Sequence, residues 1–150
     1  MKIAIGADNL GFKLKESIIK VLMDKDIKYT DIGTFNEAPV DYPDIAVKVA
    51  DMVASGEYER GILICGTGIG MAISANKVNG IRAAVCHDMY SAERAVKSNN
   101  TQIIALGALV VGEALARGLV NVWLNSEFTG GPSAYKIEKI KEIEKRNESS

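Results

Sequence analysis

The sequence predicts an α/β protein, a Rossmann-like doubly wound sheet of five parallel strands with helices on both faces, an αβα sandwich. Short apolar runs, typical of buried strands, alternate with longer stretches in which apolar residues recur at the helical period. Strands that alternate with helices imply βαβ crossovers and therefore a parallel sheet. The 150 residues, of which 47% are hydrophobic, suffice for one full core, so a single domain over residues 1–150 is predicted.

The chain begins with the apolar run Lys2–Ala7, which predicts the first strand. Apolar residues at helical spacing predict a helix over 10–24, so Asp8 should lie between the two, at the carboxyl edge of the sheet. Residues 27–32 form the second predicted strand, and 33–40 a loop.

The middle of the chain repeats this alternation. A helix begins after Asp41-Tyr42-Pro43, since a proline in the first turn lacks only an N–H that has no helical partner there. The third strand is predicted over 61–65 with its helix over 70–78, and the fourth over 81–85 with its helix over 90–97.

The last third supplies a fifth strand over 102–106 and a helix over 110–124. Gly130-Gly131-Pro132 then breaks the chain before a final helix over 134–146. Only a narrow isoleucine stripe marks that helix, which favours an arm, residues 132–147, lying on a partner subunit. A surface helix of the same subunit is the alternative. The stripe consists of Ile137, Ile140 and Ile143.

Residues 62–71, ILICGTGIGM, are the most informative stretch: an apolar run ends on a cysteine and a glycine-rich turn. The run predicts a strand buried on both faces, with Cys65 at its carboxyl end. Ligands bind at that edge of an open parallel sheet, and the amides of 66–70 would face the same crevice with a helix dipole behind them. Such a setting favours the reactive thiolate. The alternative is a small buried hydrophobe, as isolated cysteines commonly are.

Composition excludes several partners. The net charge of −1 comes from scattered residues, so no basic stripe predicts binding to nucleic acid. No apolar run reaches the roughly 18 residues of a membrane helix, and the chain begins in a strand rather than a signal peptide, so a cytoplasmic protein is expected. The two cysteines lack the CxxC spacing of a zinc or redox site, and no metal is predicted.

Three chemistries common on such sheets are not indicated. GADNLG over residues 6–11 is not the GxGxxG of a dinucleotide site, and the turn after Cys65 lacks the Lys-Ser/Thr of a nucleoside triphosphate loop. A phosphoacceptor signalling domain, a non-enzymatic alternative, would carry an aspartate where Cys65 stands.

Four motifs follow one another within residues 1–145: DYP at 41–43, ICGTGIG at 64–70, ANKV at 75–78 and GIRA at 80–83. In these motifs the chain resembles the type B ribose-5-phosphate isomerases and their galactose-6-phosphate isomerase relatives. The resemblance implies the five-stranded sheet, a homodimer with active sites at the subunit boundary, and a reaction that uses no metal or organic cofactor.

The resemblance also implies roles for single residues. Cys65 would be the base that moves a proton between C1 and C2 of an open-chain sugar phosphate through a cis-enediolate, with Thr67 hydrogen-bonded to the thiol and backbone amides holding the oxyanion. Asp8 could carry protons between the two substrate oxygens, or it could cap the following helix. The predicted substrate-binding residues are Asn9, Tyr42, Gly66, Gly68, Ile69, Gly70, His87, Arg94, Ser98, Asn99 and Lys136.

Departures from the family pattern bear on the substrate. Asn9 and Ser98 stand where the family has histidines, and the histidine replaced by Ser98 is the one credited with opening the sugar ring. Leu109, Gly130 to Ser133 and Lys136 stand where phosphate-binding arginines are expected. Arg94 is an additional cation that could bind the substrate; alternatively, it lies on a solvent-exposed helix face. Arg94 with Ser98-Asn99-Asn100 resembles a subgroup associated with erythritol breakdown and tetrose phosphates.

The leading hypothesis is therefore a cofactor-free aldose–ketose isomerase of the ribose 5-phosphate/ribulose 5-phosphate type, in the pentose phosphate pathway. A tetrose 4-phosphate isomerase is the first alternative, because a tetrose 4-phosphate cannot close to a furanose and needs no ring-opening residue. His87, which could substitute for the missing histidine or only pack its loop, leaves that choice open. An inactive sugar-phosphate binding protein is the alternative from another class.

Overall fold

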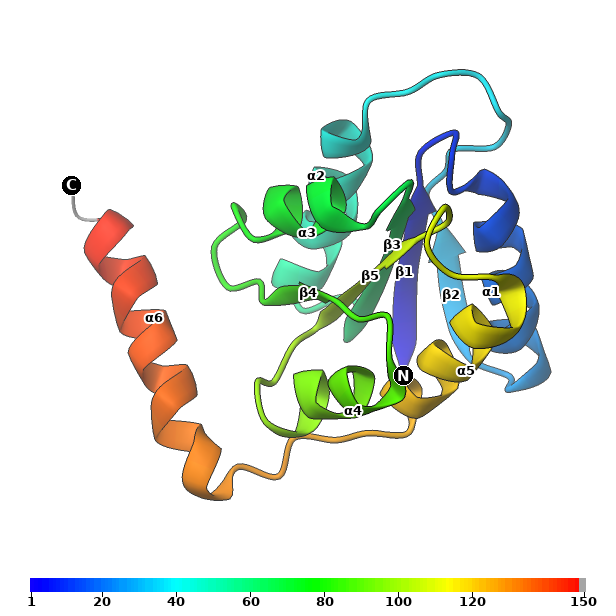
Figure 1. Ribbon diagram of the computed structural model, residues 1–150. Helices are drawn as coiled ribbons and strands as arrows, with labels where there is room; N and C mark the ends of the chain where they lie inside the picture. Colours follow the sequence, from blue (N-terminus) through cyan, green and yellow to red (C-terminus); the bar gives the residue numbers. More distant parts are fainter. Residues whose placement is uncertain (149–150) are drawn as a thin grey trace.

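Five parallel strands form one sheet in the order β2-β1-β3-β5-β4, which confirms the predicted fold class. The computed structural model describes residues 1–148, so the last two residues of the predicted domain lie outside the described part. Figure 1 shows the strands running side by side with their carboxyl ends at one edge. The strands are β1 Lys2–Ala7, β2 Lys28–Asp31, β3 Arg60–Cys65, β4 Ala83–Val85 and β5 Ile103–Gly107.

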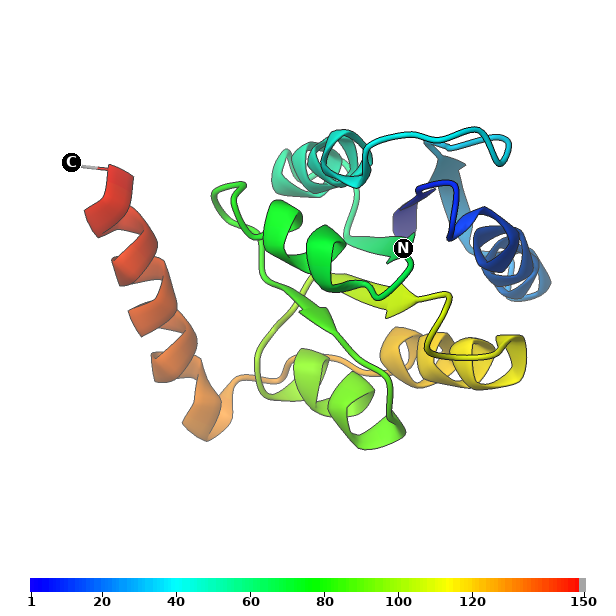
Figure 2. The ribbon, with the colours of Figure 1, turned by 45° about the horizontal axis from the view of Figure 1, so that its top comes forward.

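Helices cover both faces of the sheet (Figure 2). Helices α2 and α3 pack together on one face, and α1, α4 and α5 pack on the other. Alternate residues of each strand enter opposite cores: Ile62 and Ile64 pack with Trp123 of α5, whereas Leu63 packs with Met71 of α3. The helices are α1 Phe12–Asp24, α2 Tyr42–Ala54, α3 Ile69–Ala75, α4 Met89–Lys97, α5 Glu113–Leu124 and α6 Ala134–Glu148, the last preceded by a 3-10 turn, Gly131–Ser133.

Three elements begin two or more residues later than predicted, and hydrogen bonds in the preceding turns explain two of these shifts. Helix α1 starts at Phe12 because the Asp8 carboxylate accepts from the amides of Leu10 and Gly11. Helix α5 starts at Glu113 because the Gly107 carbonyl accepts from the amides of residues 110 and 111. Strand β4 starts at Ala83 rather than residue 81.

One ionic contact lies within the core between α1 and β2. The Lys15 side chain is fully buried, and its Nζ donates to both carboxylate oxygens of Asp31, at 2.8 and 2.7 Å. Phe12 and Phe35 present their rings to the same ammonium at 5.5 and 5.3 Å. Water cannot reach an ammonium enclosed in this way, so the buried charge depends on the Asp31 carboxylate for its stability.

Removing the carboxylate should therefore destabilise the fold. Asp31→Leu leaves the buried Lys15 ammonium with only the half-exposed Glu16 carboxylate, 3.3 Å away, and is expected to lower the free energy of unfolding by about 3 kcal/mol. Lys15→Met added to Asp31→Leu should recover much of that loss, since no charge then remains buried. Urea unfolding measures both. The control is Lys13→Met, which breaks the exposed Lys13–Glu37 pair and should cost less than about 1 kcal/mol. Equal losses in Asp31→Leu and Lys13→Met would contradict the assignment.

Candidate functional site

Cys65 and Asp8 lie beside each other at the point where the strand order reverses. From β1 the chain moves to β2 on one side, and β3 then pairs on the other side of β1. Asp8, just after β1, donates its amide to the carbonyl of Ile64 at 3.1 Å, one residue before Cys65. Such a switch point is where open α/β sheets bind ligands.

A cleft of about 450 Å³ opens over these two side chains. Its volume suits a small metabolite. Seven of the residues that line it were predicted as site residues, and three apolar residues, Leu10, Ile73 and Leu109, were not. The lining consists of Asp8, Leu10, Tyr42, Cys65, Gly66, Thr67, Ile69, Gly70, Ile73 and Leu109.

The turn after β3 supplies the thiol with a hydrogen-bond donor. The amide of Gly68 donates to Sγ of Cys65 at 3.1 Å, and the amide of Ile69 donates to Oγ1 of Thr67 at 3.2 Å. Gly68 has φ +78°, a left-handed conformation that glycine adopts without strain. The turn directs the Gly68 amide to the sulfur and the Ile69 amide to the Thr67 hydroxyl, and the bond between Thr67 and the thiol stays a prediction. An amide donates more strongly to a thiolate than to a thiol, since the acceptor is then charged.

Asp8 is a buried carboxyl, 6% exposed, on the opposite side of the cleft floor. Its Oδ1 accepts from the amides of Leu10 at 3.0 Å and Gly11 at 3.1 Å. These bonds hold the turn before α1, whose N-cap is Gly11, so Asp8 is not the N-cap itself. Burial raises the pKa of Asp8, and the two amide bonds oppose the rise. A raised pKa brings a carboxyl closer to the range in which it exchanges protons at neutral pH.

Tyr42 lies over the wall of the cleft. It starts α2, and its ring packs so closely on Gly70 that a Cβ at that position would collide with it. The ring is 40% exposed and lines the cleft, as a residue that packs over a substrate would.

Seven predicted residues do not line the cleft. Gly68 contacts the thiol through its amide. Oδ1 of Asn9 accepts from the amide of Val40 at 3.3 Å. Nε2 of His87 accepts from the amide of Gly107 at 2.9 Å. The remaining four, Arg94, Ser98, Asn99 and Lys136, lie away from the cleft and are described next.

Arg94 belongs to α4 and Ser98 is its C-cap, and neither lines the cleft. The guanidinium donates to Oγ of Ser98 at 3.3 Å and to Oε1 of Glu93 at 3.1 Å. Lys136 lies on α6, where its Nζ stands 6.0 Å from the ring centre of Tyr135. A single chain therefore does not bring these residues to Cys65.

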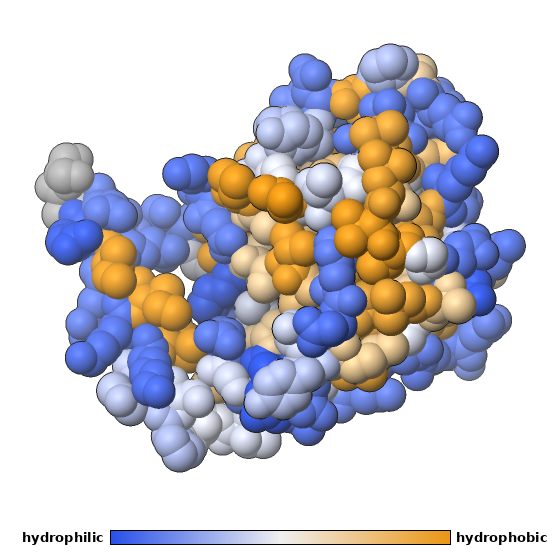
Figure 3. All heavy atoms as spheres, in the orientation of Figure 1, coloured by the Kyte–Doolittle hydropathy of each residue, from blue (hydrophilic) through white to orange (hydrophobic). Residues whose placement is uncertain are grey.

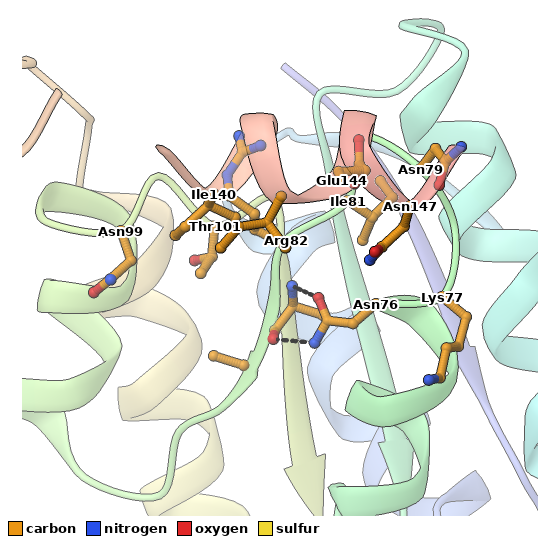
Figure 4. Close-up of a pocket in the computed structure, with 13 residues that line it drawn as sticks. Asn76, Lys77, Asn79, Ile81, Arg82, Asn99, Thr101, Ile140, Glu144 and Asn147 are labelled. Carbon is orange, nitrogen blue, oxygen red and sulfur yellow. Dashed lines mark hydrogen bonds between the residues drawn. The ribbon is translucent and has the colours of Figure 1, made fainter. Parts of the chain in front are cut away.

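A second hollow, of about 610 Å³, separates α6 from the body of the molecule (Figure 4). Asn99, Arg82 and Ile140 line it, and the side chain of Asn76 closes its floor with two bonds to the backbone of Ala83. Helix α6 is tethered near its end, where Glu144 accepts from the amide of Gly80 at 2.8 Å.

Apolar side chains gather around the cleft. Figure 3 shows them over α3 and the loop after β5, and again along α6. Many are more than half exposed, which is unusual for a face that meets only water. They are Leu10, Ile69, Ile73, Leu109 and Val110 near the cleft, with Ile143 on α6.

The geometry defines a class: an α/β enzyme that handles a small molecule with a cysteine and a carboxyl at the switch point of its sheet. No helix within residues 1–148 combines the length and apolar character needed to cross a bilayer. In the same range no three His, Cys, Asp or Glu side chains are grouped as metal ligands are.

Comparison with known proteins narrows this class. Residues 3–140 match the model of the Ribose/Galactose Isomerase family. The chain is 55% identical to Ribose-5-P isomerase B of Listeria innocua, over 98% of this chain and 99% of the relative. It is 54% identical to D-erythrulose-4-phosphate isomerase of Pectobacterium atrosepticum, over 93% of each. The solved structure of Clostridium thermocellum Ribose-5-Phosphate Isomerase B, 50% identical, superposes with a TM-score of 0.96 over 98% of this chain and 99% of that one.

The chain belongs to the ribose/galactose isomerase family. It is an aldose–ketose isomerase of sugar phosphates, which confirms the predicted family and reaction class and removes the inactive binding protein as an alternative.

Proposed function

We propose that this enzyme interconverts ribose 5-phosphate and ribulose 5-phosphate, as in the pentose phosphate pathway of the cytoplasm, with Cys65 as the catalytic base. The observation that carries the proposal is the thiol itself: it ends a buried strand, receives the Gly68 amide at 3.1 Å and faces the same cleft as the buried Asp8. Proton abstraction next to a carbonyl needs one base at the carbon and fixed donors where charge develops.

The reaction follows from this arrangement. Cys65 as thiolate removes the proton from C2 of the open-chain aldose, and the electron pair forms the C1–C2 double bond of a cis-enediolate. The same thiol returns the proton to C1, which gives the ketose. Asp8 moves a proton from the C2 oxygen to the C1 oxygen, a task that a carboxyl of raised pKa performs without net consumption of acid. No metal or organic cofactor takes part in the proposed mechanism.

A second copy of the chain completes the site in our proposal. The cleft holds a carboxyl and a thiol but no Lys or Arg, whereas a sugar phosphate carries a dianion. The cleft is rimmed by exposed apolar side chains, and α6 stands apart from its own body. A homodimer in which the partner supplies Arg94, Ser98, Asn99 and Lys136 would cover the apolar rim and provide the missing cations.

Mixed dimers test the shared site. Cys65→Ala and Lys136→Ala homodimers should each turn over sugar phosphate poorly. After the two variants are unfolded together and refolded, each mixed dimer carries one site with both residues intact, so about one quarter of wild-type activity should return. Light scattering reports whether dimers form.

Two outcomes oppose this proposal. A monomer at micromolar concentration would remove the shared site. Dimers without recovered activity would mean that no site combines Cys65 of one chain with Lys136 of the other. In Lys136→Ala itself, binding of phosphorylated sugars should weaken far more than binding of free sugars, since an ammonium contributes mainly a point charge.

Isomerisation of a tetrose 4-phosphate is the second candidate function. It is favoured by one specific observation: the single histidine of the chain is bonded to the Gly107 backbone, and none lines the cleft to open a furanose. The similarity to a relative named D-erythrulose-4-phosphate isomerase supports the same candidate.

A further inference from the structure

His87 accepts a backbone hydrogen bond from β5 just beyond the point where β4 and β5 stop pairing. Strand β4 pairs with β5 as far as Val85 and Ala105, and the amide of Cys86 still reaches the Ala105 carbonyl at 3.3 Å. The amide of Gly107, two residues further along β5, donates instead to Nε2 of His87 at 2.9 Å. A ring nitrogen that accepts carries no proton, so the imidazole is neutral with its proton on Nδ1. Burial lowers the pKa of His87, which preserves this form.

Gly107 is also the residue of β5 that contacts the turn after Cys65. A Cβ on Gly107 would lie 2.7 to 2.8 Å from the backbone of Thr67, so only a glycine fits there. The next two amides continue the contact: Ala108 donates to the Cys65 carbonyl at 2.8 Å and Leu109 to the Gly66 carbonyl at 3.0 Å. The turn that carries the thiol thus rests on residues 107–109.

We propose that His87 is a positioning residue of the isomerase: its imidazole holds the Gly107 amide and thereby fixes the support on which the Cys65 turn rests. This inference depends on the proposed role of Cys65 as the base. Loss of the acceptor leaves the Gly107 N–H without its partner, and the support can shift toward a new one. A displacement of about 1 Å at a reacting group is enough to cost on the order of 10²-fold in rate.

The same geometry argues against a chemical role for His87. The imidazole does not line the cleft of its own chain, and its accepting nitrogen is occupied by a backbone amide. With that nitrogen occupied, the imidazole cannot accept a proton from a sugar hydroxyl through it.

Two substitutions separate positioning from chemistry. The amide oxygen of His87→Gln reaches about as far from the backbone as Nε2 and can accept from Gly107, whereas His87→Leu has similar bulk and no acceptor. We expect His87→Leu to lower kcat by roughly 10- to 100-fold with little change in KM. His87→Gln should recover most of that loss.

Alkylation by iodoacetamide gives a readout that does not depend on turnover. Cys65 should react more slowly in His87→Leu than in the wild type, and near the wild-type rate in His87→Gln, because the turn presents the thiol correctly only when its support is held. Peptide mapping distinguishes the cysteines. Cys86 serves as the internal reference, since it is 2% exposed and burial raises its pKa to about 11.

The outcomes are distinct. An unchanged kcat and unchanged Cys65 alkylation in His87→Leu would overturn the inference, and so would a His87→Gln variant as impaired as His87→Leu. Should His87→Leu not fold, a tenfold loss of kcat in His87→Gln alone overturns it. Retained turnover in Cys65→Ala, measured in parallel, refutes the proposed base instead, and the alkylation rates then still decide the positioning role.

Discussion

Cys65→Ala is expected to abolish the exchange of solvent deuterium into C2 of a bound sugar phosphate while leaving binding nearly intact. The expected fall in kcat is roughly 10²- to 10⁴-fold or more, the usual contribution of a positioned acid–base group. Binding should persist because the remaining lining of the cleft, including Tyr42 and Asp8, keeps its place. The measurement is deuterium incorporation by NMR, together with binding by calorimetry.

Cys65→Ser separates the chemistry of the thiol from its shape. The serine oxygen still accepts from the Gly68 amide, but a hydroxyl is far less acidic than a thiol, so this variant should stay inactive. Cys86→Ala is the matched control, because that cysteine is buried beside α4 and lines no part of the cleft. Substantial turnover in Cys65→Ala would remove Cys65 from the mechanism.

The juxtaposition of Asp8 with Cys65 was predictable because parallel strands end at one edge. Each side chain directly follows a short apolar run, and the runs needed only to be neighbours for the two groups to meet. The direction of the hydrogen bonds was not predictable in the same way. Whether Thr67 or the Gly68 amide reaches the sulfur depends on dihedral angles within the turn, and residue spacing does not set these angles.

Long-range contacts set the other limits of prediction. From the sequence alone, Lys15 could lie on the solvent-exposed face of its helix. Only the fold brings Asp31, 16 residues later, to its ammonium. The acceptor role of His87 depends on β4 ending two residues earlier. Arg94 and Lys136 were predicted to serve the same site as Cys65, yet one chain holds them apart. A site shared between two copies leaves no trace in the spacing of residues along one chain.

The comparison of two substrates should give the second large effect: the proposed function predicts a higher kcat/KM for ribose 5-phosphate, whereas the tetrose candidate predicts a higher kcat/KM for erythrose 4-phosphate. A pentose 5-phosphate has a free C4 hydroxyl and closes to a furanose, so its isomerisation gains from a group that opens the ring. The C4 oxygen of a tetrose 4-phosphate is esterified, and its open chain needs no such help. A missing acid or base costs about 10²- to 10⁴-fold, but only for the substrate that needs it.

Ser98→His tests the cause of this difference. Ser98 stands where the ring-opening histidine is expected, and its hydroxyl accepts from Arg94 at 3.3 Å, so the position already faces a cation. The substitution should raise kcat/KM for ribose 5-phosphate by on the order of tenfold or more and leave the tetrose value nearly unchanged. His87→Gln is the control, because an amide cannot act as an acid or base yet still accepts from Gly107. Strong pentose turnover that collapses in His87→Gln would instead identify His87 as the ring-opening group, since the variant keeps the support of the Cys65 turn and removes only the titratable nitrogen.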